Sequence, residues 1–336
     1  MAPSLLASTI AGAIFGCGLF LSGVYSPWII LSQMNLSNFH MLQTFLAASG
    51  CSAIALHLAR KYNIAPSPPR SQSSLGILPY DGNILGGLLL GAGMTLTGAC
   101  PGTVLVQVAT GIRSGHFAFV GGILAGTLYA MVGEVVRGGN IKGLELKAKE
   151  EEEIGKGKGL EKDEVKTVHH YLGVGEENLV VAFESFLALI LALASLTEKA
   201  NHVLVPPVVG GLLIGVGQAA TLVLTGNAVG VSGAYGEVGE VLRRAYSGGS
   251  NEKIGSRPKY NSIAFATGIV FRIPGGEAQV DGFTAVLGGF VMVLGARTAG
   301  GCTSGHGISG MATFSISSII SVAAMFAGGM GLALFV

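Results

Sequence analysis

Charged residues are scarce in this chain of 336 residues. They make up 12% of the sequence, whereas about a quarter of the residues in a typical soluble domain are charged. Half of the residues are hydrophobic, 54 are glycine, and the mean hydropathy is +0.61. Because glycine lets helices pack closely within a membrane, this composition predicts an all-α integral membrane protein.

Several other features are missing. The formal net charge is +1 and the charges fall in a few loops, so no basic surface for a nucleic acid is expected. The four cysteines form no CxxC pair, and no nucleotide-binding loop is present, so we expect neither an enzyme nor a cofactor or resident metal. The N-terminal apolar stretch lacks the basic start of a signal peptide, which makes it the first membrane segment. We expect a multi-pass protein in the lipid bilayer of the plasma membrane.

Apolar runs divide the chain into about nine candidate transmembrane segments. They cover residues 5–22, 39–58, 84–96, 117–136, 179–196, 203–224, 263–271, 283–294 and 316–336. Crossing a bilayer takes about 20 apolar residues, so we expect the shorter segments to be tilted, broken or re-entrant. Short glycine-interrupted segments at matching places in two halves are typical of a transporter's binding site.

The two halves repeat each other. Residues 84–88 align with residues 286–290 at an offset of 202, and Cys100 falls on Cys302 at the same offset. With four segments in each half and one between them, the second half starts on the opposite side of the membrane, which predicts inverted repeats. The excess of basic residues after segments two, four and six places the N-terminus in the cytoplasm.

These boundaries define a domain organisation. The first membrane repeat covers residues 1–136, and a charged, solvated inter-repeat loop covers residues 137–178. A connecting transmembrane segment covers residues 179–202. The second repeat covers residues 203–336 and contains a basic loop at 240–259.

Two glycine-rich stretches with a cysteine each, residues 98–102 and 300–310, are the candidate substrate site. Such backbone is tolerated at membrane depth only where protein or a water-lined cavity surrounds it, and its N–H groups can face an anion. A thiol there can donate a weak S–H bond to a soft sulfur atom; as a thiolate it can exchange with one or ligate a soft metal. The candidate residues are Cys100, Cys302, Gly98, Pro101, Gly102, Gly301, Thr303, Ser304 and Gly305.

Three further candidates occur in one half only. His306 lies four residues after Cys302. It is either a functional residue (a proton relay, a metal ligand or a hydrogen-bond donor to an anion) or a structural histidine held by a backbone carbonyl. Arg297 is either functional at membrane depth or extends to the interface. Cys17 is either part of the site or a packing residue, because its repeat position holds alanine.

The sequence of residues 300–310, GGCTSGHGISG, closely resembles the signature of the YeeE/YedE sulfur-transport family, and residues 93–102 and 16–23 are similar to its other motifs. The resemblance implies an hourglass-shaped bundle whose broken helices meet at a central constriction. It also implies uptake of thiosulfate, or a related sulfur anion, through transient contacts with the thiols of Cys100, Cys302 and Cys17.

Other functions remain open on the residues alone. The substrate of such a transporter can be another sulfur species or a selenium species. A membrane thiol sulfurtransferase or oxidoreductase would form a persulfide or disulfide at Cys302. A metal carrier would use Cys302 and His306.

Overall fold

The computed structural model describes residues 4–64, 68–132, 167–168, 171, 173–196, 204–228, 230–246, 260–270 and 280–336. Within these residues the chain is helical, and strand-like pairing is limited to one bridge between Thr167 and Ser315. The helices are α1 (Leu5–Leu21), α2 (Pro27–Met34), α3 (His40–Lys61), α4 (Asp81–Thr97), α5 (Pro101–Thr110), an unlabelled helix Arg113–Val132, α8 (Glu176–Ser195), α9 (Pro207–Thr225), α10 (Ser232–Tyr246), α11 (Asn261–Ile269), α12 (Gly282–Thr298), the π-helix η1 (Thr303–Gly310) and α13 (Ile316–Ala333). The all-α prediction is confirmed for the part of the chain that the structure describes.

Six of the described helices are long and apolar enough to cross a membrane, or seven if the bent pair α12 and η1 is one span. The pair is bent by 44°, which agrees with the expectation of broken segments. Two of the nine predicted segments form helices that are too short to count among these spans: α1 has 17 residues and α11 has 9. The short helices α2 and α10 were not predicted as separate elements.

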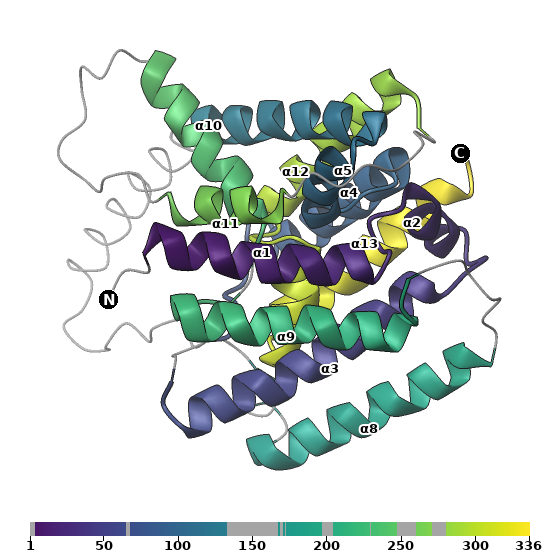
Figure 1. Ribbon diagram of the computed structural model, residues 1–336, viewed down its shortest axis with the longest axis vertical. Coiled ribbons are helices and arrows are strands. Elements are labelled where there is room, and N and C mark those ends of the chain that lie inside the picture. The colour runs from purple at the N-terminus through teal and green to yellow at the C-terminus, as the bar shows by residue number, and fades with distance from the viewer. Residues whose placement is uncertain are drawn as a thin grey trace.

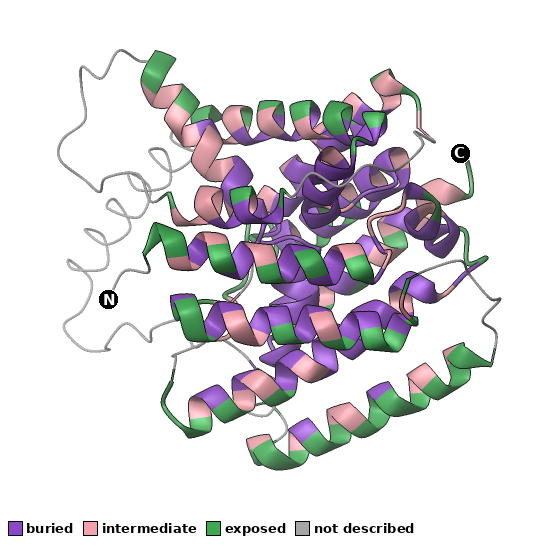
Figure 2. Ribbon diagram, in the orientation of Figure 1, coloured by how far each residue is buried: buried purple, intermediate pink, exposed green. Residues whose placement is uncertain are grey.

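The long helices form one bundle (Figure 1). α4 packs against α12 and α13, α1 packs against α9 and α11, and α3 packs against α9. α8 lies at the edge of the bundle on α3 (Figure 1). Its apolar stretch is 17% buried, compared with 67% for that of α3, and Figure 2 shows its outer face exposed. α8 therefore presents most of its apolar surface to lipid.

Helix directions follow from the residues that touch. α1 runs antiparallel to α9, because Gly18 lies on Ile214 while Phe15 lies on Gly217. α4 likewise runs antiparallel to α12. α4 runs parallel to α13, where the Thr95 hydroxyl donates to the Gly329 carbonyl at 2.8 Å. Helix Arg113–Val132 runs parallel to α12, as the order of the glycine contacts along the two helices shows.

The two charged regions fall largely outside the described residues. Residues 137–166 of the inter-repeat loop and residues 247–259 of the basic loop are among those that the structure does not describe. The domain boundaries therefore remain predictions. Glu134 and Arg137, which lie at the end of the predicted segment 117–136, also fall outside the described residues.

Candidate functional site

Cys100 lies at a break between two helices. α4 ends at Gly98, whose positive φ of 59° is a conformation that suits glycine, and Pro101 starts α5 at the position where proline is tolerated. Cys100 is the N-cap of α5. The Thr103 N–H and hydroxyl each donate to its Sγ at 3.4 Å, and the Cys100 N–H donates to the Thr103 hydroxyl at 2.7 Å. This reciprocal capping box fixes the direction of the thiol.

Cys302 lies at the corresponding break in the second half. The chain turns after α12 at Gly300, which has a φ of 81°, and continues into η1. The Cys302 Sγ lies 3.2 Å from the Ser304 hydroxyl, and Ser232 at the start of α10 lies close to this sulfur. The five glycines of residues 300–310 disfavour a regular α-helix interior. The stretch forms a π-helix instead, a conformation frequent at functional sites.

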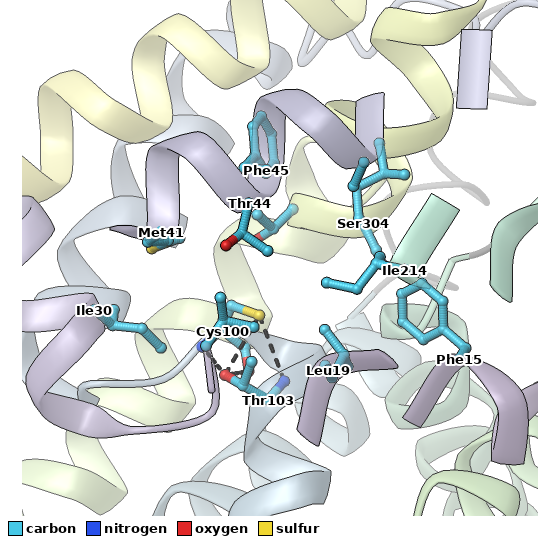
Figure 3. A pocket seen from close by; sticks show the side chains of 15 residues that line it. Phe15, Leu19, Ile30, Met41, Thr44, Phe45, Cys100, Thr103, Ile214 and Ser304 are labelled. Atoms are coloured by element: carbon cyan, nitrogen blue, oxygen red, sulfur yellow. Dashed lines mark hydrogen bonds between the residues drawn. The ribbon is translucent and has the colours of Figure 1, made fainter. Parts of the chain in front are cut away.

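A cavity of about 50 Å³ lies between the two breaks (Figure 3). A single water needs about 10–15 Å³, so this space suits a solute of a few heavy atoms. Its walls are apolar apart from one thiol and four hydroxyl groups. The lining residues are Phe15, Leu19, Val24, Ile30, Met41, Thr44, Phe45, Ala48, Cys100, Gly102, Thr103, Ile214, Thr303, Ser304 and Ile308.

The cavity joins the two cysteine motifs. Cys100 and Thr103 line it from the first half, and Thr303 and Ser304 line it from the second. Cys302 itself is fully buried and reaches the cavity wall through its contact with Ser304. Of the nine candidates that the repeated motifs supplied, the structure thus places Cys100, Gly102, Thr303 and Ser304 at one cavity.

α10 supports both motifs, which the sequence did not indicate. Tyr235 is 2% exposed, and its hydroxyl donates to the Pro101 carbonyl at 3.0 Å. Ser232, one turn earlier, faces the Cys302 sulfur. The short helix α10 therefore contacts the helix breaks at both Cys100 and Cys302.

The His306 imidazole is held between two groups away from the cavity. Its Nε2 lies 3.0 Å from the Ala299 carbonyl and its Nδ1 lies 3.0 Å from the Ser318 hydroxyl. Although the His306 N–H bonds to the Cys302 carbonyl, the ring and the thiol have different partners. These contacts favour the structural role of His306, in which a backbone carbonyl holds the ring, over a role in binding the substrate.

Arg297 and Cys17 also lie outside the cavity. The Arg297 guanidinium is 5.3 Å from the centre of the Tyr129 ring and lies against Gly236 of α10. Cys17 is exposed on α1, between Phe15 and Leu19, both of which line the cavity. Within the described ranges, no three His, Cys, Asp or Glu side chains gather into a metal-binding group.

Arg70 is a residue of the site region that sequence reasoning missed. It lies in the proline- and serine-rich loop after α3, where it counted only as a basic loop residue. Its Nε donates to the Gly305 carbonyl at 2.8 Å and its Nη1 to the Gly300 carbonyl at 3.2 Å. The hydroxyls of Ser315 and Ser317 donate to the Arg70 carbonyl at 2.7 and 2.9 Å. These contacts join residues about 230 positions apart, so no local pattern reveals them.

The position of Arg70 explains why two of the predicted site residues, Gly301 and Gly305, are glycine. A Cβ atom on Gly305 would lie 3.0 Å from the Arg70 Nη2, and one on Gly301 would lie 2.9 Å from the His306 ring and 3.3 Å from the Arg70 Nη1. Real Cβ atoms rarely approach so closely. These glycines therefore make room for the guanidinium.

A bundle of apolar helices with a small cavity between two broken spans defines a multi-pass membrane transporter. A family profile described as sulphur transport matches residues 25–331, and the chain belongs to this family. Two relatives from Xylella fastidiosa, strains Temecula1 / ATCC 700964 and 9a5c, are each named "Probable transporter". They are 33% and 32% identical over 139 residues, which cover 92% of each relative and 38% of this chain.

Proposed function

We propose that the protein conducts thiosulfate into the cell through the cavity between Cys100 and Cys302. The observation that carries this proposal is the Cys100 thiol, fixed by Thr103 and facing a space whose opposite wall holds Thr303 and Ser304. A soft thiol suits the terminal sulfur of thiosulfate. The hydroxyls can donate to its anionic oxygens.

The proposed passage is non-covalent. The Cys100 S–H donates a weak hydrogen bond to the terminal sulfur of the substrate, and the Cys302 S–H replaces it as the anion advances. The Ser304 hydroxyl touches both the cavity and the Cys302 sulfur, so it lies where this exchange would occur. No bond to sulfur is made or broken, and the thiols return to their starting state.

Growth on thiosulfate as sole sulfur source tests this role. In a host without its own thiosulfate uptake, we expect the wild-type protein to restore growth and the double variant Cys100→Ala/Cys302→Ala to fail. Cys51→Ala is the matched control, because Cys51 lies against Gly215 at the contact of α3 and α9. Full growth of the double variant would contradict the thiol mechanism. Growth on a different sulfur or selenium source alone would assign another substrate.

Two inverted repeats around the cavity are part of the same proposal. α1 and α9 are repeat partners that run antiparallel, as are α4 and α12. The parallel contact of α4 with α13 has a counterpart in that of α12 with helix Arg113–Val132. The relatives align over almost their whole length to little more than a third of this chain, which is consistent with a half-chain unit.

Inverted repeats with nine spans require the end of α3 and the end of α13 to face opposite sides of the membrane. We expect an impermeant maleimide added to intact cells to label Leu334→Cys but not Lys61→Cys, in a background without the native cysteines. Labelling of both positions from the same side would contradict this topology.

A further inference from the structure

The cavity at Cys100 contains no positive charge. None of its lining residues is basic, and a dianion in an apolar space costs free energy unless a cation or several donors compensate for it. A cation does lie on the other side of the Cys302 motif. It is the guanidinium of Arg70.

The loop that carries Arg70 is fixed in place. Ser315 and Ser317 at the start of α13 hold its carbonyl, and the Ser73 hydroxyl donates to the Thr298 carbonyl at 2.6 Å. The Ser73 N–H also donates to the Asn83 side chain at 2.7 Å. These contacts attach the loop to α13, α12 and α4, so the guanidinium has a defined position.

The Arg70 guanidinium still has donors to offer. It has five N–H groups, of which one on Nε and one on Nη1 bind the Gly305 and Gly300 carbonyls. Among the described residues, no carboxylate forms an ion pair with it. A Cβ atom on Gly301, the residue before Cys302, would lie 3.3 Å from the Arg70 Nη1. Arg70 thus places a positive charge, and donors that no described residue accepts, at the Gly300 and Gly305 carbonyls on either side of Cys302.

We propose that Arg70 determines anion selectivity, by forming with Cys302 a second anion subsite that follows the Cys100 cavity along the path. The guanidinium binds the oxygens of a sulfur oxyanion while its terminal sulfur contacts the Cys302 thiol. This inference rests on the proposed function for the identity of the substrate. The anion selectivity itself does not depend on thiosulfate.

The test measures how the charge of a thiol reagent affects its reaction with Cys302. The full-length protein, with Cys17, Cys51 and Cys100 replaced by alanine, is purified in detergent. It is treated with anionic sulfonatoethyl methanethiosulfonate or with the cationic trimethylammonium-ethyl analogue of similar size. Mass spectrometry gives the rate of each reaction, and the ratio of the two rates is compared between variants.

We expect Cys302 to react faster with the anionic reagent when Arg70 is present. Arg70→Gln should lower the anionic-to-cationic ratio about tenfold, and Arg70→Lys should retain most of it. Arg113→Gln is the control, because Arg113 is an exposed arginine at the start of another helix. A general loosening of the fold would raise both rates together and leave the ratio unchanged.

Two results would overturn the inference: a ratio that Arg70→Gln does not change, and a Cys302 that neither reagent modifies. Uptake assays separate this inference from the proposed function. If the ratio shifts but labelled thiosulfate is not transported by any variant, the anion subsite stands and the substrate assignment fails. If thiosulfate is transported and Arg70→Gln leaves both the ratio and the KM unchanged, the subsite fails alone.

Discussion

Cys100 and Cys302 occupy matching positions in the two halves, but their sulfur atoms have different surroundings. The Cys100 thiol faces the cavity and accepts two hydrogen bonds from Thr103. The Cys302 thiol is buried behind Ser304, with Arg70 on the far side of its motif. In the proposed path, the substrate would therefore meet a neutral subsite at Cys100 and a positive subsite at Cys302.

Thr103 is the residue on which the orientation of Cys100 depends most. Thr103→Val keeps the side-chain shape but removes the hydroxyl that bonds to the Cys100 N–H and Sγ. We expect a loss of about 1 kcal/mol in the free energy of unfolding and a fall in thiosulfate uptake of about fivefold. Thr103→Ser retains the hydroxyl and should behave like the wild type. Equal uptake by both variants would show that the capping box does not position the thiol.

Glu184 illustrates a residue whose place the sequence left uncertain. A charged residue in the first third of the predicted segment 179–196 favours a place near the segment end, yet Glu184 lies within α8 with its carboxylate against Gly50 of α3. Periodicity finds a helix but does not fix its depth in the bilayer. The expectation of a segment end was therefore wrong, for lack of any signal for where the membrane boundary falls.

At the scale of helices, the contacts of α4 with α12 and α13 depend on glycine. A Cβ atom on Gly328 of α13 would overlap the Leu88 carbonyl of α4, whereas no atom lies within 4 Å of the Cβ position of Gly331 on the same helix. Small residues of this kind let membrane helices approach closely. The two glycines are thus a matched pair within α13.

Gly328→Ala should lower the free energy of unfolding by about 1–3 kcal/mol, because the added methyl group separates α13 from α4. Gly331→Ala should leave stability unchanged or raise it slightly, since alanine favours a helix. Thermal unfolding of the purified protein in detergent measures both. A melting temperature for Gly328→Ala equal to that of Gly331→Ala would contradict the close contact.

α10 has an ion cluster on its outer part. Glu240 accepts hydrogen bonds from Arg243 at 2.8 and 3.0 Å and from Arg244 at 2.9 Å, and these arginines lower the pKa of the Glu240 carboxyl to about 2. Because the pKa is lower in the folded state, the stabilisation is present above the ordinary pKa and disappears as the pH falls toward 2. α10 contacts both cysteine motifs, so its stability matters for the site.

Glu240→Gln should therefore lower the melting temperature at pH 7 but hardly at all near pH 2. The cluster is partly exposed and screened by salt, so its contribution at pH 7 is about 0.5–1 kcal/mol. Melting of the two proteins is compared at several pH values in detergent. A difference that stays constant down to pH 2 would exclude an origin in the charge of Glu240.

The nine apolar segments predicted from the sequence all correspond to helices, and the helix ends differ by a few residues. Composition and the length of apolar runs are enough to predict these helices, because a helix in a membrane forms all of its backbone hydrogen bonds within its own segment. The paired motifs of Cys100 and Cys302 were likewise recognisable from their common offset. Arg70 and Tyr235 were not, since their contacts with residues far along the chain arise only when the helices pack.

At the scale of the whole molecule, the bundle joins two halves through one small cavity. α1 begins at one side of the bundle and α13 ends at the other (Figure 1). α8 lies outside the packed centre on α3, where the His57 and Arg60 side chains bind Glu176 at 3.1 and 2.6 Å. It connects the halves without contributing to the cavity wall.

Uptake of labelled thiosulfate into proteoliposomes tests whether the cavity between the two thiols is the transport path. Wild-type protein, Cys100→Ala, Cys302→Ala and the control Cys51→Ala are reconstituted in equal amounts. We expect wild type and Cys51→Ala to accumulate label, and each cavity variant to lose at least about tenfold in rate, since each removes a contact on the only proposed route. Undiminished uptake by both Cys100→Ala and Cys302→Ala would contradict it.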